Sequence, residues 1–327
     1  MLGGLLALLA ALTFAINNAA FRRGALTGTV AQGMAISLAI GVVLFVVVAS
    51  LTGAWSAAAA FPANSFLMLC AAGVLHFAWG RYCNFRATKA MGANLVGPPQ
   101  QMSIVVTLVL AIVLLGEALT PLRLLGILLV IFGPAVSLRA RKATLGPDAT
   151  ASTFKPNYAE GYTFALLSAT GYGTSPILVR TALQDGGLVA SIAGGLIAYV
   201  AAAGVMAFAL LSPALRGGIF SVDRVSRKWF SISGALVAIS QMTGYMALAV
   251  APVSVVTPIQ RLSLVFRVFA NSLLNREHEV IGGRIWAATI IGLIGAIALS
   301  LSTDYVLEVL PLPEWLETIA RWQWPAA

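Results

Sequence analysis

The segment PIQRLSLVFRVFANSLLNRE, residues 258–277, decides the fold, because a related segment occurs 160 positions earlier as PPQQMSIVVTLVLAIVLLGE, residues 98–117. The aligned pairs include Pro98 and Pro258, Gln100 and Gln260, Ser103 and Ser263, and Glu117 and Glu277. Two membrane helices can share apolar letters by chance. A shared proline, glutamine and serine followed at equal distance by an acid instead indicates an internal duplication.

The composition indicates that this duplication lies in a membrane. The 327 residues are 59% hydrophobic and only 9% charged, with a mean hydropathy of +0.92. Soluble proteins carry about 25% charged residues. The apolar residues also gather in blocks of about 20, the length that crosses a bilayer as a helix. We therefore predict an all-α polytopic membrane protein.

Ten transmembrane helices are predicted, five in each copy of the duplication. They lie near residues 2–20, 32–52, 64–83, 94–115, 121–138, 159–178, 188–212, 230–249, 253–274 and 284–302. The repeats then cover residues 1–138 and 158–302, with a polar linker at 139–157 and a tail at 303–327. The apolar N-terminus is interpreted as a retained first span, because it lacks the basic region of a signal peptide. In the tail, Trp315, Ile319 and Trp322 recur at helical spacing, which favours a helix lying in the interface over a frayed terminus.

The distribution of basic residues predicts the orientation. The net charge is +9, and most lysines and arginines fall in the connections that follow spans one, three, five, seven and nine. By the positive-inside rule this side is cytoplasmic, which places both termini outside a bacterial-type inner (plasma) membrane. No basic patch is interleaved with aromatic residues, so nucleic acid is not an expected partner.

Five spans in each repeat imply that the two repeats enter the membrane from opposite faces. Secondary transporters with such inverted repeats hold their substrate at mid-depth between the two halves. The alternative is a duplicated scaffold that has no role in transport.

Two of the predicted spans carry a polar face. On a helix of 3.6 residues per turn the ninth span aligns Thr257, Gln260, Ser263, Arg267 and Asn271, with Ser254 and Arg261 at the edge, and the fourth aligns Gly97, Gln100, Ser103 and Thr107, with Gln101 at the edge. A charge inside a span costs about 2.5–3.5 kcal/mol, so such residues usually face the bundle interior or water. We therefore expect Arg261 and Arg267 to meet an anionic group in a water-filled cavity. Snorkelling, or pairing with Glu277 or with carbonyl groups, is the alternative.

Other polar residues at membrane depth extend the predicted lining. The candidate substrate-binding residues are Asn17, Arg81, Gln100, Ser103, Tyr172, Gln241, Gln260, Arg261 and Arg267. Asn18, His76 and Ser175 lie near them. Several of these residues have an alternative role. Asparagines in spans also serve as hydrogen-bond partners between helices, and a histidine such as His76 is more often a packing residue than a proton carrier. The alternative for Arg81 is a position at the cytoplasmic interface.

These residues resemble the EamA repeat of the drug/metabolite transporter superfamily. The resemblance rests on the residues that lead into spans four and nine and on the glutamates at the ends of these spans, Glu117 and Glu277. It also rests on the glycine-containing helices that follow, LLGILLVIFG and IIGLIGAIALS. It implies ten helices in two inverted repeats, a central cavity and alternating access. The first span offers Asn17 and Asn18 where small drug exporters of the superfamily have a glutamate, which argues against cationic drugs and against carboxylate-based proton coupling. Well-studied ten-span relatives have their termini inside, opposite to the orientation predicted here.

The expected function is secondary transport of a small anionic or zwitterionic metabolite, with a flippase for a lipid or lipid-linked anion as the alternative. The sequence contains no nucleophile–base pair, no HExxH motif and no phosphate-binding glycine loop, so we do not expect an enzyme. Cys70 and Cys83 are predicted to be buried thiols, without a disulfide or a metal site. The expected partners are a small-molecule substrate and the lipid bilayer, with no cofactor, and a homodimer is left open.

Overall fold

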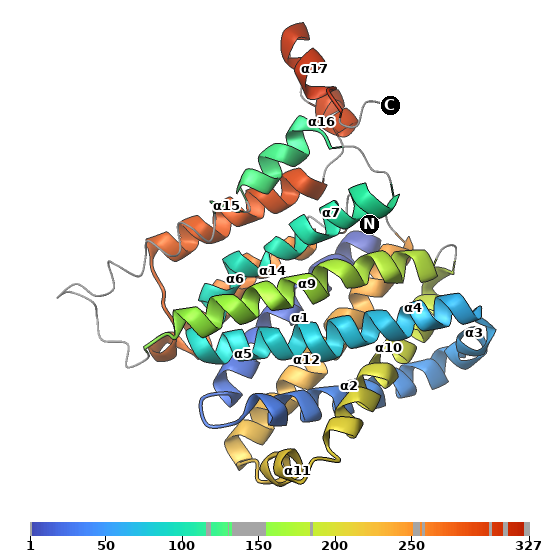
Figure 1. Cartoon of the computed structure of the whole chain (residues 1–327), viewed down its shortest axis with the longest axis vertical. Coiled ribbons are helices and arrows are strands. Elements are labelled where there is room, and N and C mark those ends of the chain that lie inside the picture. Colours follow the sequence, from blue (N-terminus) through green and yellow to red (C-terminus); the bar gives the residue numbers. More distant parts are fainter. Residues whose placement is uncertain are drawn as a thin grey trace, which may run out of the picture.

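In the computed structural model, the described part of the chain is built from helices (Figure 1). The structure describes residues 2–115, 119–129, 131–132, 155–183, 186–250, 256, 259–300, 303–309 and 313–323. Most of the predicted linker, the end of the predicted fifth span, Glu117, Ser254, Thr257 and Pro258 lie outside these residues.

The helices of the first half follow the predicted spans, but the first and third extend beyond the predicted ends. They are α1 (Leu2–Gly24), α2 (Val30–Thr52), α3 (Ala54–Ala60), α4 (Ala63–Gly73), the π-helix η1 (Val74–Gly80), α5 (Arg81–Met91), α6 (Ala93–Gln100) and α7 (Met102–Leu115). The predicted third span at 64–83 is too short, because α4, η1 and α5 continue one another from Ala63 to Met91. Gly92 ends this helix with a φ of 89°, a conformation that favours glycine.

The second half is also helical. They are α9 (Tyr158–Ala182), α10 (Gly187–Ala209), α11 (Pro213–Phe220), α12 (Arg224–Val250), α14 (Ser263–Leu274), the 3₁₀ turn η2 (Arg276–His278) and α15 (Gly283–Ser300). Among the described residues, four helical stretches are long and apolar enough to cross a membrane, namely Leu2–Gly24, Val30–Thr52, Ala63–Met91 and Gly187–Ala209. The chain is therefore an all-helical protein of the membrane type, as its composition predicts.

The fourth and ninth predicted spans are not continuous helices, which corrects the prediction. The fourth is divided at Gln101 into α6 and α7, and in the ninth a turn at Leu262 precedes α14. In the fourth, Pro98 and Pro99 lack the N–H group that a helix needs, so the regular ladder of hydrogen bonds is interrupted. Gln101 N–H bonds to the Pro98 carbonyl and Leu262 N–H to the Ile259 carbonyl, each over three residues.

The two halves of the chain interleave. Helix α1 packs against α12 and α14, helix α10 against α2 and α4, and helix α9 against α4, α5 and α7. In Figure 1, α9 and the α4–α5 helix run side by side across the middle of the molecule. A site between the halves is therefore built from both.

Connections far apart in the sequence meet at one end of the bundle, which we call the basic end. It is formed by residues 24–29, 89–92, 155–157, 210–223 and 275–282, which are joined by hydrogen bonds such as Arg22 to His278, Asn157 to Ala90, Thr27 to Ser226 and Gln32 to Gly218. The exposed cations in these segments or within a few residues of them are Lys89, Lys155, Arg216, Arg224, Arg227, Lys228, Arg276 and Arg284. The basic end corresponds to the side that the distribution of lysine and arginine predicts to be cytoplasmic.

The tail lies apart from the bundle at the top of Figure 1, as α16 (Thr303–Val309) and α17 (Glu314–Ala320). Trp315, Ile319 and Trp322 are each more than half exposed. Arg321 forms ion pairs with Asp304 and Glu317, which hold the two short helices together.

Close packing between the halves depends on glycine at the α4–α10 contact. A Cβ at Gly73 would overlap the backbone of Ala198, which cannot move aside as a side chain can. We expect Gly73→Ala to lower the free energy of unfolding by about 1–3 kcal/mol. Gly204→Ala on α10 is the matched control, because nothing lies within 4 Å of its added Cβ. Denaturation of both variants in detergent checks this, and equal stability would contradict the packing described here.

Candidate functional site

Gln100 and Arg267 meet between α6 and α14, the helices that bear the two polar faces. Arg267 Nη1 and Nη2 each donate a hydrogen bond of 3.2 Å to Gln100 Oε1. Ser263, Arg267 and Asn271 are four residues apart and all buried, so α14 turns its polar face into the protein. The ring of Phe14 lies 5.8 Å from Arg267 Cζ. The partner of Arg267 is thus an amide and not Glu277, which is exposed.

A chain of amides fixes the orientation of Gln100. Gln100 Nε2 donates to Asn84 Oδ1 at 3.0 Å, and Asn84 Nδ2 donates to Asn18 Oδ1 at 3.3 Å. Asn18 Nδ2 donates to the Phe14 carbonyl at 2.7 Å. Because its Nε2 is engaged, Gln100 presents its Oε1 acceptor to Arg267. Asn18 and Asn84 therefore position the site through Gln100.

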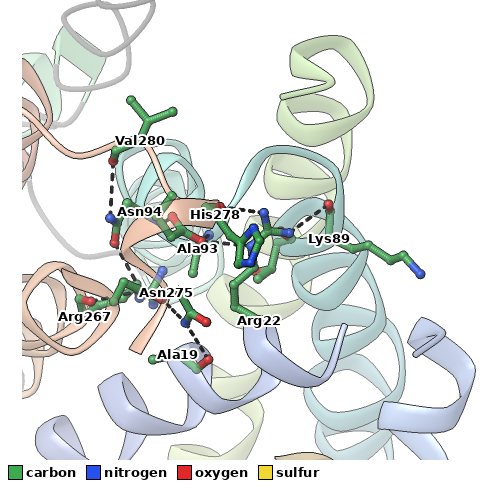
Figure 2. Close-up of polar contacts among 12 residues, drawn as sticks. Ala19, Arg22, Lys89, Ala93, Asn94, Arg267, Asn275, His278 and Val280 are labelled. Carbon is green, nitrogen blue, oxygen red and sulfur yellow. Dashed lines mark hydrogen bonds and ion pairs between the residues drawn. The ribbon is translucent and has the colours of Figure 1, made fainter. Parts of the chain in front are cut away.

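A second chain of amides runs from Arg267 towards the basic end (Figure 2). Asn271 Nδ2 donates to the Arg267 carbonyl at 3.0 Å and to Asn94 Oδ1 at 3.1 Å. Asn275 Nδ2 donates to Asn271 Oδ1 at 2.8 Å and to the Ala19 carbonyl at 2.9 Å. These contacts join α14 to α1 and to the start of α6.

This chain leads to a buried ion pair that the sequence did not reveal. Arg22 Nε lies 3.1 Å from Glu279 Oε1, and the side chains are 2% and 0% exposed. The predicted first span, near residues 2–20, leaves Arg22 in the connection that follows it. In the structure α1 continues to Gly24 and buries it. The sequence signal for a buried Arg22 was its position two residues past the predicted end of the first span. We found no sequence signal for the burial of Glu279.

Glu279 is held by backbone groups as well as by Arg22. Its Oε1 accepts from Ala93 N–H at 2.6 Å and its Oε2 from Asn94 N–H at 2.9 Å. These N–H groups open α6, where a helix stabilises negative charge. Burial raises the pKa of the Glu279 carboxyl, while the charge of Arg22 and the two N–H groups lower it. Arg22 Nη2 also donates to the His278 carbonyl at 2.7 Å, so the pair ties α1 and α6 to the connection before α15.

Arg81 is buried in an aromatic environment. It is 2% exposed, and its Nη2 donates to the Tyr199 hydroxyl at 2.8 Å. Its Cζ lies 4.9 Å from the ring centroid of Phe77 and 5.1 Å from that of Tyr199. Its Nη1 is buried without a hydrogen-bond partner among the described residues. Arg81 directly follows the π-helix η1, a distortion that occurs frequently at functional sites.

Arg261 has the least compensated charge of the candidates. Its Nε is buried, and within the described ranges the side chain has neither a hydrogen bond nor an ion pair. Gln260 lies beside α12, where a Cβ added to Gly244 would come within 3.0 Å of Gln260 Nε2. Both residues precede the turn at Leu262, at the break in the ninth predicted span.

The other candidate residues are more dispersed. Asn17 accepts a 2.6 Å hydrogen bond from Ser233 Oγ on α12, which favours the helix–helix role. Tyr172 packs against the ring of His76 at 4.5 Å, and His76 Nδ1 lies 2.6 Å from Ser175 Oγ. Ser103 is buried and Gln241 is half-buried.

Arg81 and Arg267 are enclosed in this conformation, whereas we expected Arg267 to face a water-filled cavity. Arg267 and Arg81 are each 2% exposed because amides and aromatic rings pack around them. A pocket of about 380 Å³ lies at the basic end and is lined by Val30, Tyr82, Arg86, Lys89, Ala90 and Glu160. Cys83 is buried as predicted, whereas Cys70 is partly exposed.

Membrane-length apolar helices that enclose buried charges define an integral membrane protein. The chain resembles a protein of known crystal structure with 19% identity and a TM-score of 0.60, over 94% of this chain and 98% of that one. This likeness concerns the fold alone. A comparison with curated proteins gives no match.

The family comparison makes the class specific. Residues 1–139 match the EamA-like transporter family. The resemblance to the EamA repeat that the sequence predicts is thereby confirmed over these residues.

Proposed function

We propose that the protein is a secondary transporter that moves a small anionic or zwitterionic metabolite by alternating access. In this proposal ten helices form two inverted repeats, residues 1–138 and 158–302, joined by the linker at 139–157. The basic end faces the cytoplasm of a cell whose plasma membrane holds the protein, and α17 lies in the membrane interface. The substrate binds between the repeats at mid-depth.

The observation that carries this proposal is a set of three arginine side chains without carboxylate partners. Among the described residues, Arg81, Arg261 and Arg267 form no ion pair. Glu279 exerts an electrostatic effect on Arg267, but its oxygens are engaged by Arg22, Ala93 and Asn94. Charges at membrane depth are retained where they serve an ion or substrate path. An anionic group on the substrate supplies the missing negative charge.

The broken helices support the same location. The interruptions at Gln101 and at Leu262 occur at nearly equivalent positions of the duplicated segments. Discontinuous helices in corresponding positions of two repeats are typical of transporter binding sites. Gln100 and Arg261 stand next to these interruptions, and Arg267 lies one to two turns into α14.

Transport by the reconstituted protein tests the proposal. The flux of a panel of metabolites is measured in proteoliposomes that contain the wild type, Arg261→Gln or Arg267→Gln. Each carboxylate in the panel is compared with the corresponding amide. We expect carboxylate flux in the wild type and a loss of at least about tenfold in both variants, because a hydrogen bond to a charged group contributes about 1.5–3 kcal/mol. Arg180→Gln, at an exposed position on α9, is the matched control and keeps the wild-type flux. Equal transport of carboxylates and amides by the wild type would contradict the proposal.

A further inference from the structure

We infer that the Arg22–Glu279 ion pair is a latch that closes the basic end of the substrate path and separates when that end opens. This inference rests on the proposed transport function. The pair lies between the candidate site and the solvent of the basic end, and it joins elements from both halves of the chain.

The chemistry of the pair suits a contact that forms and breaks. Moving two charges out of water costs several kcal/mol for each ion, so a buried pair adds little net stability over apolar packing. When the basic end opens, water solvates both groups and replaces the energy of the contact. Apolar side chains brought together at the same place would instead favour the closed state alone.

Glycine allows the close approach on which the latch depends. A Cβ at Gly92 would lie 2.9 Å from Glu279 Oε2 and 3.0 Å from Glu279 Oε1, and the φ of Gly92 is 89°. Gly92 therefore serves two purposes, because it ends α5 and leaves room for the carboxylate. Gly92→Ala displaces Glu279 without removing either charge.

The latch is connected to the candidate site by an unbroken series of hydrogen bonds. Glu279 accepts from Asn94 N–H, Asn94 Oδ1 accepts from Asn271, and Asn271 donates to the Arg267 carbonyl. Figure 2 shows Arg267, Asn94 and Arg22 along this series. A substrate that draws Arg267 away from Gln100 also moves Asn271, which is bonded to the Arg267 carbonyl. Asn271 is in turn bonded to Asn94, whose N–H group holds Glu279.

The accessibility of a cysteine behind the latch tests the inference. Ser263 is buried one turn before Arg267 on the same face of α14, so Ser263→Cys is the reporter in a background of Cys70→Ala and Cys83→Ala. Membrane vesicles of both orientations are treated with a membrane-impermeant maleimide. With an open state of about 0.1–10% in the wild type, we expect Glu279→Gln and Gly92→Ala to accelerate labelling from the basic end at least about tenfold. Arg22→Lys, which keeps the charge, gives a smaller increase.

The Arg86–Glu160 ion pair provides the matched control. It also joins the two halves at the basic end, with a separation of 2.8 Å, but its side chains are 43% and 35% exposed. Glu160→Gln is expected to leave the labelling rate of Ser263→Cys unchanged. Equal acceleration in this control, or equal acceleration from both ends of the protein, indicates general loosening and overturns the latch.

Folding is monitored by gel filtration and by thermal denaturation of each variant. An unchanged labelling rate in folded Glu279→Gln protein overturns the inference, and if that variant does not fold, Gly92→Ala and Arg22→Lys decide in the same way. Labelling requires no substrate. If no anion is transported although Glu279→Gln labels faster, the proposed substrate class is wrong and the latch stands.

Discussion

Glu279→Ala is expected to lower the free energy of unfolding by about 3–5 kcal/mol, because it leaves the Arg22 guanidinium buried without its counter-charge. The same change removes the acceptor of the Ala93 and Asn94 N–H groups at the start of α6. Arg22 cannot reach water by rotating, since it is 1% exposed and bound to the carbonyls of Thr88, Lys89 and His278. Unfolding by SDS titration in mixed micelles measures this loss.

Glu160→Ala provides the comparison with an exposed ion pair. The Arg86–Glu160 pair is half-exposed, and exposed ion pairs contribute about 0–1 kcal/mol. We therefore expect a loss several times smaller than the loss in Glu279→Ala. Similar losses in the two variants would mean that the burial of Arg22 and Glu279 has no energetic consequence, which contradicts the account of the basic end.

Arg261→Leu is expected to raise the free energy of unfolding by about 3 kcal/mol in the absence of substrate. The insertion cost of a central arginine is about 2.5–3.5 kcal/mol, and leucine is favourable at the same depth. The arginine recovers none of this cost from an ion pair or a hydrogen bond within the described part of the chain. If Arg261 is kept for binding and not for stability, its replacement raises the free energy of unfolding, whereas Glu279→Ala lowers it.

The SDS titration that measures Glu279→Ala also checks this second prediction, with and without each transported carboxylate. The wild type is stabilised by the anion, because a ligand that binds only the folded state stabilises it, and Arg261→Leu has lost this response. Arg180→Leu, at an exposed position, is the control for the loss of one positive charge. If Arg261→Leu lowers the stability of the substrate-free protein, Arg261 has a structural partner and the binding role is wrong.

The sequence was most informative in the two similar segments, residues 98–117 and 258–277, that share polar residues. Gln100 and Arg267 were found because both polar faces follow the helical period, and the structure joins these two side chains by hydrogen bonds. The prediction of a membrane protein followed from the overall composition, and it does not depend on the contacts of any single residue. Asn17 was also found, although its bond to Ser233 shows a helix–helix contact.

Other features depend on tertiary contacts that periodicity does not encode. Arg22 and Glu279 stand near opposite ends of the chain, so no spacing rule relates them. The π-helix at Val74–Gly80 and the breaks at Gln101 and Leu262 change the helical register, which a uniform helical wheel ignores. The enclosure of Arg81 and Arg267 is likewise a property of the conformation and not of either helix alone.

An experimental structure of the protein with a transported anion bound tests the central claim most directly. The claim is that the unpaired guanidinium groups receive negative charge from the substrate. We predict an anion oxygen within about 3 Å of a nitrogen of Arg261 or Arg267, since the Nε atoms of both are buried without partners among the described residues. An anion bound elsewhere, with both guanidinium groups held by protein carboxylates or carbonyls, would contradict it.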